Sequence, residues 1–466
     1  MQKDNTWEKY TESQSKSCHD FCQGYMDFLS SGKTERECVK IIKKDIEAAG
    51  YQPLDEYIAS GTPLKPGDKI YRINMNKSVV MFNMGTDPIE NGMNILGAHI
   101  DSPRMDVKQQ PLYEDGGFAL MDTHYYGGIK KYQWVTIPLA LHGVVVKKDG
   151  TAVEICIGEK ADDPVFFVSD LLIHLAAEQM EKKAAKVIEG EALDIIVGNR
   201  PVKVSEDDGP KDPVKAGVLE VLKADYGIDE DDFVSAELEV VPAGRAREAG
   251  FDRSMILSYG QDDRVCAYTS YQAMLEVPDV SRTACCILVD KEEIGSVGAT
   301  GMQSKFFENT VAEVIALCTD YSELLLKRCL ANCTMLSSDV SSAFDPTYAG
   351  SFDKKNAAFL GNGMVFNKFT GARGKSGSND ANAEYLAHLR QIFSEEDVNF
   401  QTAELGKVDL GGGGTIAYIL ALYGMNVIDS GVAVLNMHAP FEATSKADVY
   451  ETKRGYVAFL KKAKRL

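Results

Sequence analysis

Apolar and polar positions alternate along the chain in a way that predicts helices packed on short buried strands. Residues 34–50 are typical of an amphipathic helix: Thr34 and Glu37 have capping-box spacing, apolar residues follow at helical intervals, and Gly50 ends the pattern. Short apolar runs that indicate buried strands lie at residues 78–82, 93–99, 284–289, 333–336 and 431–436. From residue 254 onward the two patterns alternate, which predicts an α/β fold with helices layered on the faces of a sheet.

The middle of the chain has a different pattern of apolar and polar residues. Residues 134–146 and 151–157 are two β-like runs separated by a short polar turn, which is the pattern of a hairpin. We therefore expect a β-rich domain of residues 106–248, inserted into an α/β domain that is formed by residues 1–105 and 249–466. A length of 466 residues leaves room for both domains.

Composition narrows the classes of partner and the compartment. The chain has 50 Lys and Arg against 69 Asp and Glu, a net charge of −19, which works against binding to the phosphate backbone of nucleic acids. Its apolar stretches are far shorter than the roughly 20 residues that span a bilayer, and residues 1–7 lack the apolar segment of a signal peptide. Ten cysteines scattered along a long chain are typical of reduced thiols. We expect a cytoplasmic protein with no nucleic-acid or membrane partner.

Acidic and imidazole side chains follow four of the predicted strands. They are His99 and Asp101, Glu292 and Glu293, Asp339, and His438. In α/β sheets, ligands bind outside the carboxyl ends of the strands, so we expect these side chains to meet at one edge of the sheet. A further carboxylate, Asp262, opens the helical pattern of residues 265–275 and could bridge two ions.

This mixture of ligand types indicates a pair of divalent metal ions. Five ligands, His99, Asp262, Glu293, Asp339 and His438, suit Zn²⁺, or alternatively Mn²⁺ or Co²⁺, with two ions about 3.5–4 Å apart. Residues two apart on a strand share a face, so Asp101 can reach His99 and fix the orientation of its ring. Of the adjacent pair Glu292 and Glu293, one can bind metal while the other serves as a general base, which is a hydrolase arrangement.

The motifs around these residues resemble those of a known family. Segments 97–104, 262–264, 290–296 and 437–438 are similar in order and spacing to the motifs of the M18 aminopeptidases, the family of aspartyl aminopeptidase and the yeast vacuolar aminopeptidase. The resemblance extends over nearly the whole chain and points to the bacterial members. It implies a di-zinc exopeptidase acting on peptides with a free N-terminus. It also implies a zinc-exopeptidase-like layered α/β catalytic domain, interrupted by a β-rich lid and oligomerisation domain. Family members assemble into homo-oligomers, typically tetrahedral dodecamers.

The resemblance assigns a role to each candidate residue. It implies metal-binding roles for five of them: His99 on one ion, His438 on the other, Glu293 and Asp339 as further ligands, and Asp262 as the bridge. It implies that Glu292 is the general base and that Asp101 orients His99.

Departures from the family pattern bear on the substrate. The run 341–347 lacks the histidines that aspartyl aminopeptidases carry there, and a family histidine of the inserted domain is replaced near Asp170. We therefore expect a preference for neutral or basic N-terminal residues rather than strictly acidic ones. The candidate substrate-binding residues are Asp345, Lys368, Asp170 and His124.

Two other interpretations of the sequence remain open. A related metallohydrolase, such as a carboxypeptidase or an N-acyl amino acid deacylase, needs an arginine for a free carboxylate, and Arg104 or Arg264 could serve. A catalytically silent shell protein would have lost the base or a ligand, and all of these residues are present.

Overall fold

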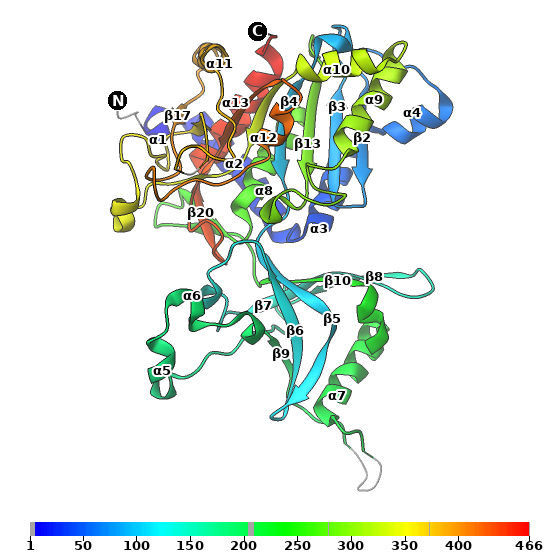
Figure 1. Cartoon of the computed structure of the whole chain (residues 1–466), viewed down its shortest axis with the longest axis vertical. Coiled ribbons are helices and arrows are strands. Elements are labelled where there is room, and N and C mark those ends of the chain that lie inside the picture. Colours follow the sequence, from blue (N-terminus) through cyan, green and yellow to red (C-terminus); the bar gives the residue numbers. More distant parts are fainter. Residues whose placement is uncertain (1–4, 204–208, 278, 372, 466) are drawn as a thin grey trace. The chain divides into compact units, whose positions relative to one another are not determined.

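The computed structural model describes residues 5–203, 209–277, 279–371 and 373–465, so the sequence prediction for residues 1–7 falls partly outside it. The chain divides into two compact units, drawn in Figure 1. The first unit consists of Met1–Asp101, Ala246–Met437 and Glu442–Leu466, and the second of Ser102–Arg245 and His438–Phe441. The sequence predicts these boundaries at 105/106 and 248/249, and it assigns the short segment 438–441 to the α/β domain.

A nine-stranded sheet forms the centre of the first unit. Its strands, in spatial order, are β1 (Gln52–Pro53), β2 (Lys69–Asn74), β3 (Ser78–Asn83), β13 (Ala284–Val289), β4 (Asn94–His99), β14 (Thr334–Ser338), β18 (Asn426–Gly431), β16 (Met364–Asn367) and β17 (Phe400–Thr402). The four neighbours β13, β4, β14 and β18 run parallel to one another. Their carboxyl ends therefore lie at the same edge of the sheet.

Helices cover both faces of this sheet. The helices of this unit are α1 (Thr6–Lys9), α2 (Glu12–Ser31), α3 (Glu35–Ala48), α4 (Leu54–Ser60), α8 (Gln261–Glu276), α9 (Phe306–Cys318), α10 (Glu323–Ala331), α11 (Ala383–Glu395), α12 (Ala417–Ala421) and α13 (Lys446–Lys462). Alternate residues of β13 enter different apolar cores: Cys286 packs in the core that includes residues of α2, α8 and α13, while Ile287 packs in the core of α9, α10 and α12. Successive side chains of a strand point to opposite faces of the sheet, so each face packs against its own set of helices. The unit therefore has three layers, with the sheet between two layers of helices.

The predicted helix of residues 34–50 is confirmed as α3. The Thr34 hydroxyl accepts a hydrogen bond from the Glu37 amide, and the Glu37 carboxylate accepts one from the Thr34 amide at 3.1 Å. The strand predictions at 78–82, 93–99, 284–289 and 333–336 are also confirmed, as β3, β4, β13 and β14. Within the described residues, no helix combines the length and apolar character needed to cross a membrane.

The strand predicted at 431–436 is present, but it belongs to another sheet than the sequence analysis predicted. The chain leaves β18 at Gly431 and enters β19 (Ala433–Leu435), which belongs to a separate sheet. The order of that five-stranded sheet is β11 (Arg247–Ala249), β12 (Met255–Ser258), β20 (Glu442–Ser445), β19 and β15 (Ser341–Ser342). Residues 431–434 are all buried, so the hydrophobicity of this run does not mark the change of sheet. A Cβ atom at Gly431 would lie 2.0 Å from the carbonyl oxygen of Asp339, so this close approach requires glycine.

The second unit contains an antiparallel six-stranded sheet. Its spatial order is β8 (Ala152–Ile157), β7 (Leu139–Val146), β10 (Ala236–Pro242), β5 (Arg104–Asp115), β6 (Phe118–Tyr126) and β9 (Ile195–Gly198). Its short helices are α5 (Ala177–Met180), α6 (Ala184–Val187) and α7 (Pro213–Val221). The predicted hairpin is present as β7 and β8. However, the strand begins at Leu139 rather than at residue 134, and Pro138, which has no amide proton for a sheet ladder, lies just before it.

Candidate metal centre

Three side chains of the first unit converge where β4 and β14 end and α8 begins. His99 is the last residue of β4, Asp262 is the second residue of α8, and Asp339 follows β14. One donor atom from each lies within 4.8 Å of the others. The Nε2 atom of His99 is 3.3 Å from Oδ1 of Asp262, and both side chains are almost fully buried. The parallel strands therefore bring together an imidazole and two carboxylates that are distant in the sequence.

Asp101 connects His99 to the loop after β13. Its Oδ1 atom lies 3.2 Å from His99 Nδ1, and its backbone carbonyl oxygen lies 3.1 Å from the same nitrogen. The two oxygens of its carboxylate also accept hydrogen bonds from the backbone amides of Glu292 and Glu293, each at 3.2 Å. One fully buried carboxylate thus fixes both an imidazole and the turn that carries two glutamates.

The two glutamates occupy a tight turn at the carboxyl end of β13. Residues Glu292–Ile294 form a single 3₁₀ turn, preceded by Lys291 with a φ of 69°. A left-handed backbone is uncommon outside glycine and concentrates at functional sites. Oε2 of Glu292 lies 3.9 Å from His99 Nε2. Glu293 offers a carboxylate oxygen within 4.8 Å of one from Asp262. Glu292 therefore approaches the cluster at His99, whereas Glu293 approaches it at Asp262.

Two buried carboxylates support the cluster and were not among the predicted site residues. Asp263, which is joined to Asp262 by a cis peptide bond, accepts a hydrogen bond from the His99 amide at 3.4 Å. Glu442 on β20 accepts one from the Asp262 amide at 3.0 Å, and its backbone carbonyl accepts one from the Gln261 side chain at 2.6 Å. Asp263 is visible in the sequence as part of an acidic pair, whereas Glu442 reaches the site only through the strand order of the five-stranded sheet.

The electrostatics of the cluster suit a bound cation. Burial raises the pKa of Asp339 and Asp263 well above the usual range, and the neighbouring carboxylates add to this effect at Asp339. Burial by itself would lower the pKa of His99, but hydrogen bonds to Asp101 and Asp262 and the charge of Glu292 hold that pKa well above its ordinary value. Several buried acids around one imidazole are costly unless positive charge compensates them. Carboxylate oxygen and imidazole nitrogen are ligands for zinc, so the residues fit this metal.

The predicted ligand His438 belongs to the second unit. It has a φ of 64°, and its Nδ1 atom lies 2.9 Å from the carbonyl oxygen of Gly128, also in the second unit. The strand before it, β19, is not part of the nine-stranded sheet, so the expectation that all four strands end at one sheet edge is wrong for this residue. Its role as a metal ligand remains a prediction.

The four predicted substrate-binding residues make local contacts. In the first unit, Asp345 caps a 3₁₀ helix by accepting a hydrogen bond from the Thr347 amide, and Lys368 pairs with Asp380 at 2.6 Å. In the second unit, Asp170 accepts hydrogen bonds from the Leu171 amide and from Gln179, while the exposed His124 ring lies 2.8 Å from the carbonyl oxygen of Tyr125. Their contacts identify no substrate, and their role stays a prediction.

The layered α/β unit and its cluster of imidazole and carboxylates fit the class of metallohydrolases, and comparison with known proteins identifies the family. The family model of aminopeptidase I zinc metalloproteases, M18, matches residues 28–460. The probable M18 family aminopeptidase 1 of Clostridium acetobutylicum is 61% identical over 456 residues, which cover 98% of this chain and 97% of that protein. The chain therefore belongs to the M18 family and is a peptidase hydrolase, as the sequence motifs predicted.

Solved structures agree with this assignment. The crystal structure of an M18 aminopeptidase from Thermotoga maritima is 44% identical, has a TM-score of 0.93, and matches 99% of this chain over 100% of its own length. The mApe1 dodecamer of Saccharomyces cerevisiae is 20% identical with a TM-score of 0.75, covering 94% of this chain and 96% of the yeast chain. That more distant likeness shows the fold alone.

Proposed function

We propose that the chain is an aminopeptidase that uses two divalent metal ions to remove the N-terminal residue of peptides. The observation that carries this proposal is the convergence of His99, Asp262 and Asp339, whose donor atoms lie within 4.8 Å of one another. Glu292 stands beside them, with its Oε2 atom 3.9 Å from Nε2 of His99. Membership of the M18 family supplies the reaction class.

The proposed ligands divide between two ions. His99 and Asp339 would hold one ion, Glu293 and His438 the other, and Asp262 would bridge them. Zn²⁺ is the favoured metal because of the ligand types, with Mn²⁺ and Co²⁺ as alternatives. When bound, such a pair lowers the pKa of a water molecule and polarises the scissile carbonyl group.

The chain's own residues handle the protons. Glu292 takes a proton from the attacking water and passes it to the leaving amine as general base and then general acid. Asp101 keeps the His99 ring in its binding orientation, and the hydrogen bonds from the Glu292 and Glu293 amides to its carboxylate hold the base and a ligand in fixed relation. The same carboxylate would therefore control both metal binding and proton transfer.

The proposed substrate preference is for neutral or basic N-terminal residues. The run 341–347 contains Asp345 where the resembling segment of aspartyl aminopeptidases bears histidines, and Asp170 stands near the position of another family histidine. Carboxylates in place of basic groups disfavour an acidic substrate side chain by like-charge repulsion. Lys368 and His124 complete the set of proposed substrate contacts.

The alternative metallohydrolases need an arginine for a free carboxylate, and the two candidates have other partners. Nε of Arg104 lies 2.8 Å from Asp106 and 3.2 Å from Glu239, and its guanidinium stacks on Tyr126. Arg264 is fully buried and donates a hydrogen bond to the carbonyl oxygen of Lys33. These contacts favour structural roles over substrate binding.

We also propose that the chain forms a homo-oligomer in the cytoplasm, with a tetrahedral dodecamer as the specific expectation. An exposed apolar segment supports assembly: Leu172, Ile173, Leu175 and Met180 of the second unit are each more than half exposed. Apolar side chains gathered in this way mark interaction surfaces. All ten cysteines are free, which agrees with a reducing compartment.

The test is hydrolysis of a panel of amino-acid p-nitroanilides by metal-stripped protein reconstituted with Zn²⁺, Mn²⁺ or Co²⁺. We expect metal-dependent release from Leu and Lys substrates that exceeds release from the Asp substrate. Equal turnover of all three would refute the preference. N-blocked peptides serve as the control: if they are cleaved and free-amine substrates are not, the deacylase or carboxypeptidase interpretation is correct. No turnover of either class would support the silent shell.

A further inference from the structure

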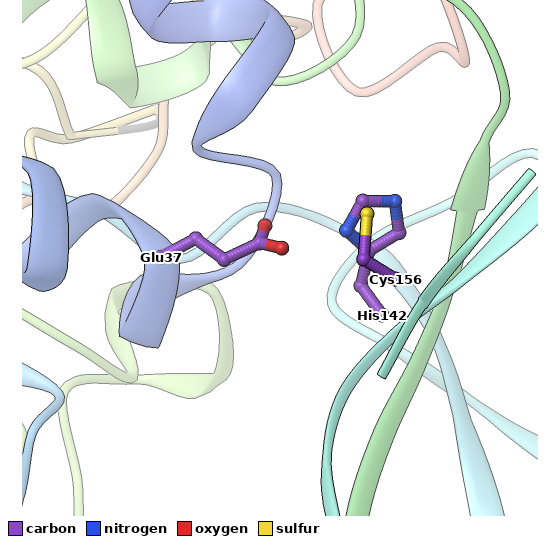
Figure 2. A group of neighbouring side chains, drawn as sticks. All are labelled: Glu37, His142 and Cys156. Atoms are coloured by element: carbon purple, nitrogen blue, oxygen red, sulfur yellow. The ribbon is translucent and has the colours of Figure 1, made fainter. Parts of the chain in front are cut away.

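A thiol and an imidazole face each other on two paired strands of the second unit. His142 of β7 and Cys156 of β8 are direct cross-strand partners in the antiparallel register. A ring nitrogen of His142 and the Cys156 sulfur lie within 4.8 Å, and the two side chains stand side by side in Figure 2. Glu37, also drawn there, belongs to the first unit and is not a member of the pair. We propose that Cys156 and His142 form a zinc-binding site of the second unit, additional to the metal centre of the peptidase.

The His142 ring is held in the way that is usual for metal-binding histidines. Its Nε2 atom lies 3.1 Å from Oε1 of Glu159, whose other carboxylate oxygen accepts a hydrogen bond from the Gly244 amide at 3.3 Å. The His142 side chain is only 2% exposed, so the ring has little freedom to turn. A carboxylate on one ring nitrogen fixes the tautomer and makes the imidazole a better ligand for zinc.

Cys156 differs from the other thiols of the chain. Of the ten cysteines, it is the exposed one, Cys318 is half-buried, and the other eight are buried. Its place on β8, an edge strand of the six-stranded sheet, lets solvent and ions reach the sulfur. A Zn–S bond of about 2.3 Å and a Zn–N bond of about 2.0 Å place the two ligand atoms at most about 4.3 Å apart. The sulfur and the ring nitrogen lie within 4.8 Å, and rotation of the exposed Cys156 side chain can adjust their separation.

The other acidic neighbours on the same row of the sheet are already neutralised. Glu239 of β10 is the cross-strand partner of His142 on its other side, and Asp106 of β5 is the next partner in the row. Both carboxylates contact Arg104, at 3.2 and 2.8 Å from its Nε atom. The cation site is therefore assigned to the Cys156 side of His142. Two protein ligands leave coordination positions for water, which predicts an ion that exchanges readily.

Cobalt provides a probe that separates this site from the peptidase centre. Co²⁺ bound to a thiolate has a strong sulfur-to-metal charge-transfer absorption in the near ultraviolet, whereas an imidazole and carboxylate site has none. Titration of the metal-stripped full-length chain with Co²⁺ should produce this band, and added Zn²⁺ should remove it. Cys156→Ser, a change at an exposed position, should abolish the band, while the matched control Cys318→Ser should keep it.

Replacement of Glu159, which contacts the His142 ring, should weaken metal binding rather than abolish it. Glu159→Gln should weaken Co²⁺ binding at this site by roughly 10- to 100-fold, as expected for loss of a partner that orients a metal-binding histidine. Absence of the charge-transfer band at saturating Co²⁺ would overturn the proposal. So would a band that persists in Cys156→Ser. Because the readout is absorption rather than hydrolysis, failure of this proposal is independent of the proposed peptidase function.

Discussion

The residues predicted to bind metal and those predicted to bind substrate are held by the fold in very different ways. The side chains of His99, Asp101 and Asp262 are at most 4% exposed and contact one another across distant parts of the chain. Lys368, by contrast, is 44% exposed and pairs with an equally exposed carboxylate, and Asp170 contacts residues nearby in the sequence. The first set is shaped by tertiary structure, and the second by local structure.

This difference has a physical origin. Ionisable groups are expensive to bury, so a buried cluster of acids around an imidazole persists only where protons or a cation, such as a bound metal ion, compensate its charge. Exposed charged pairs contribute little and tolerate change. The proposed chemistry therefore rests on buried residues, while the proposed selectivity rests on exposed groups that the fold constrains little.

The largest expected effect is at the proposed base. Glu292→Gln removes the proton acceptor but retains size and hydrogen bonding, so kcat for Leu p-nitroanilide should fall by about 10²- to 10⁴-fold with little change in zinc content. Glu395→Gln, an exposed glutamate on α11, is the matched control and should keep full activity. A loss below tenfold at Glu292 would assign the base elsewhere.

The next largest effect concerns stability and compares a core residue with a surface residue. Leu96 of β4 is completely buried, so Leu96→Ala should lower the free energy of unfolding by about 2–5 kcal/mol through lost packing and a cavity. Leu172→Ala, at a side chain that is 54% exposed, should change it by less than about 0.5 kcal/mol. Chemical denaturation of both variants, under conditions that keep any assembly dissociated, measures the contrast. Equal losses would mean that the exposed apolar segment that contains Leu172 is packed in the monomer.

A smaller effect is expected at the orienting carboxylate. Asp101→Asn weakens the hold on the His99 ring and on the Glu292 turn, and should reduce zinc affinity or activity by roughly 10- to 100-fold. Competition with a chelator measures the affinity. Asp320→Asn, at an exposed aspartate of the same unit, should leave it unchanged. Wild-type zinc affinity in Asp101→Asn would contradict the proposal that Asp101 orients His99 for metal binding.

The smallest effect concerns selectivity. Asp170→Asn removes one exposed carboxylate, so the ratio of kcat/KM for Lys over Leu p-nitroanilide should fall by no more than about fivefold, the worth of a solvent-screened ion pair. Asp162→Asn, also exposed in the second unit, is the comparison and should not change the ratio. An unchanged ratio in Asp170→Asn would exclude this residue from substrate binding.

Much of the fold could be predicted because its signals are local. The capping box of α3 and the apolar runs of β4, β13 and β14 are read directly from neighbouring residues. The polar residues that come after those runs predicted which side chains meet, since parallel strands share a carboxyl edge, and His99 and Asp339 do lie together.

The remainder depends on long-range structure that has no local signal. The passage from β18 to β19 between two sheets occurs within one buried apolar run. Glu442 reaches Asp262 only because β20 pairs with β12, next to the start of α8. The site's predicted ligands were therefore easier to find than the carboxylate that supports one of them.

The measurement that tests the central claim most directly is the zinc content of two variants. One carries Cys156→Ser alone, and the other carries Cys156→Ser together with Asp262→Ala. The first variant lacks the additional site proposed for the second unit, so it should bind two ions per chain and retain peptidase activity. Loss of Asp262, the proposed bridge, should remove tight binding of both ions and abolish activity together. One ion per active chain, or full activity after the loss of Asp262, would contradict a dinuclear aminopeptidase.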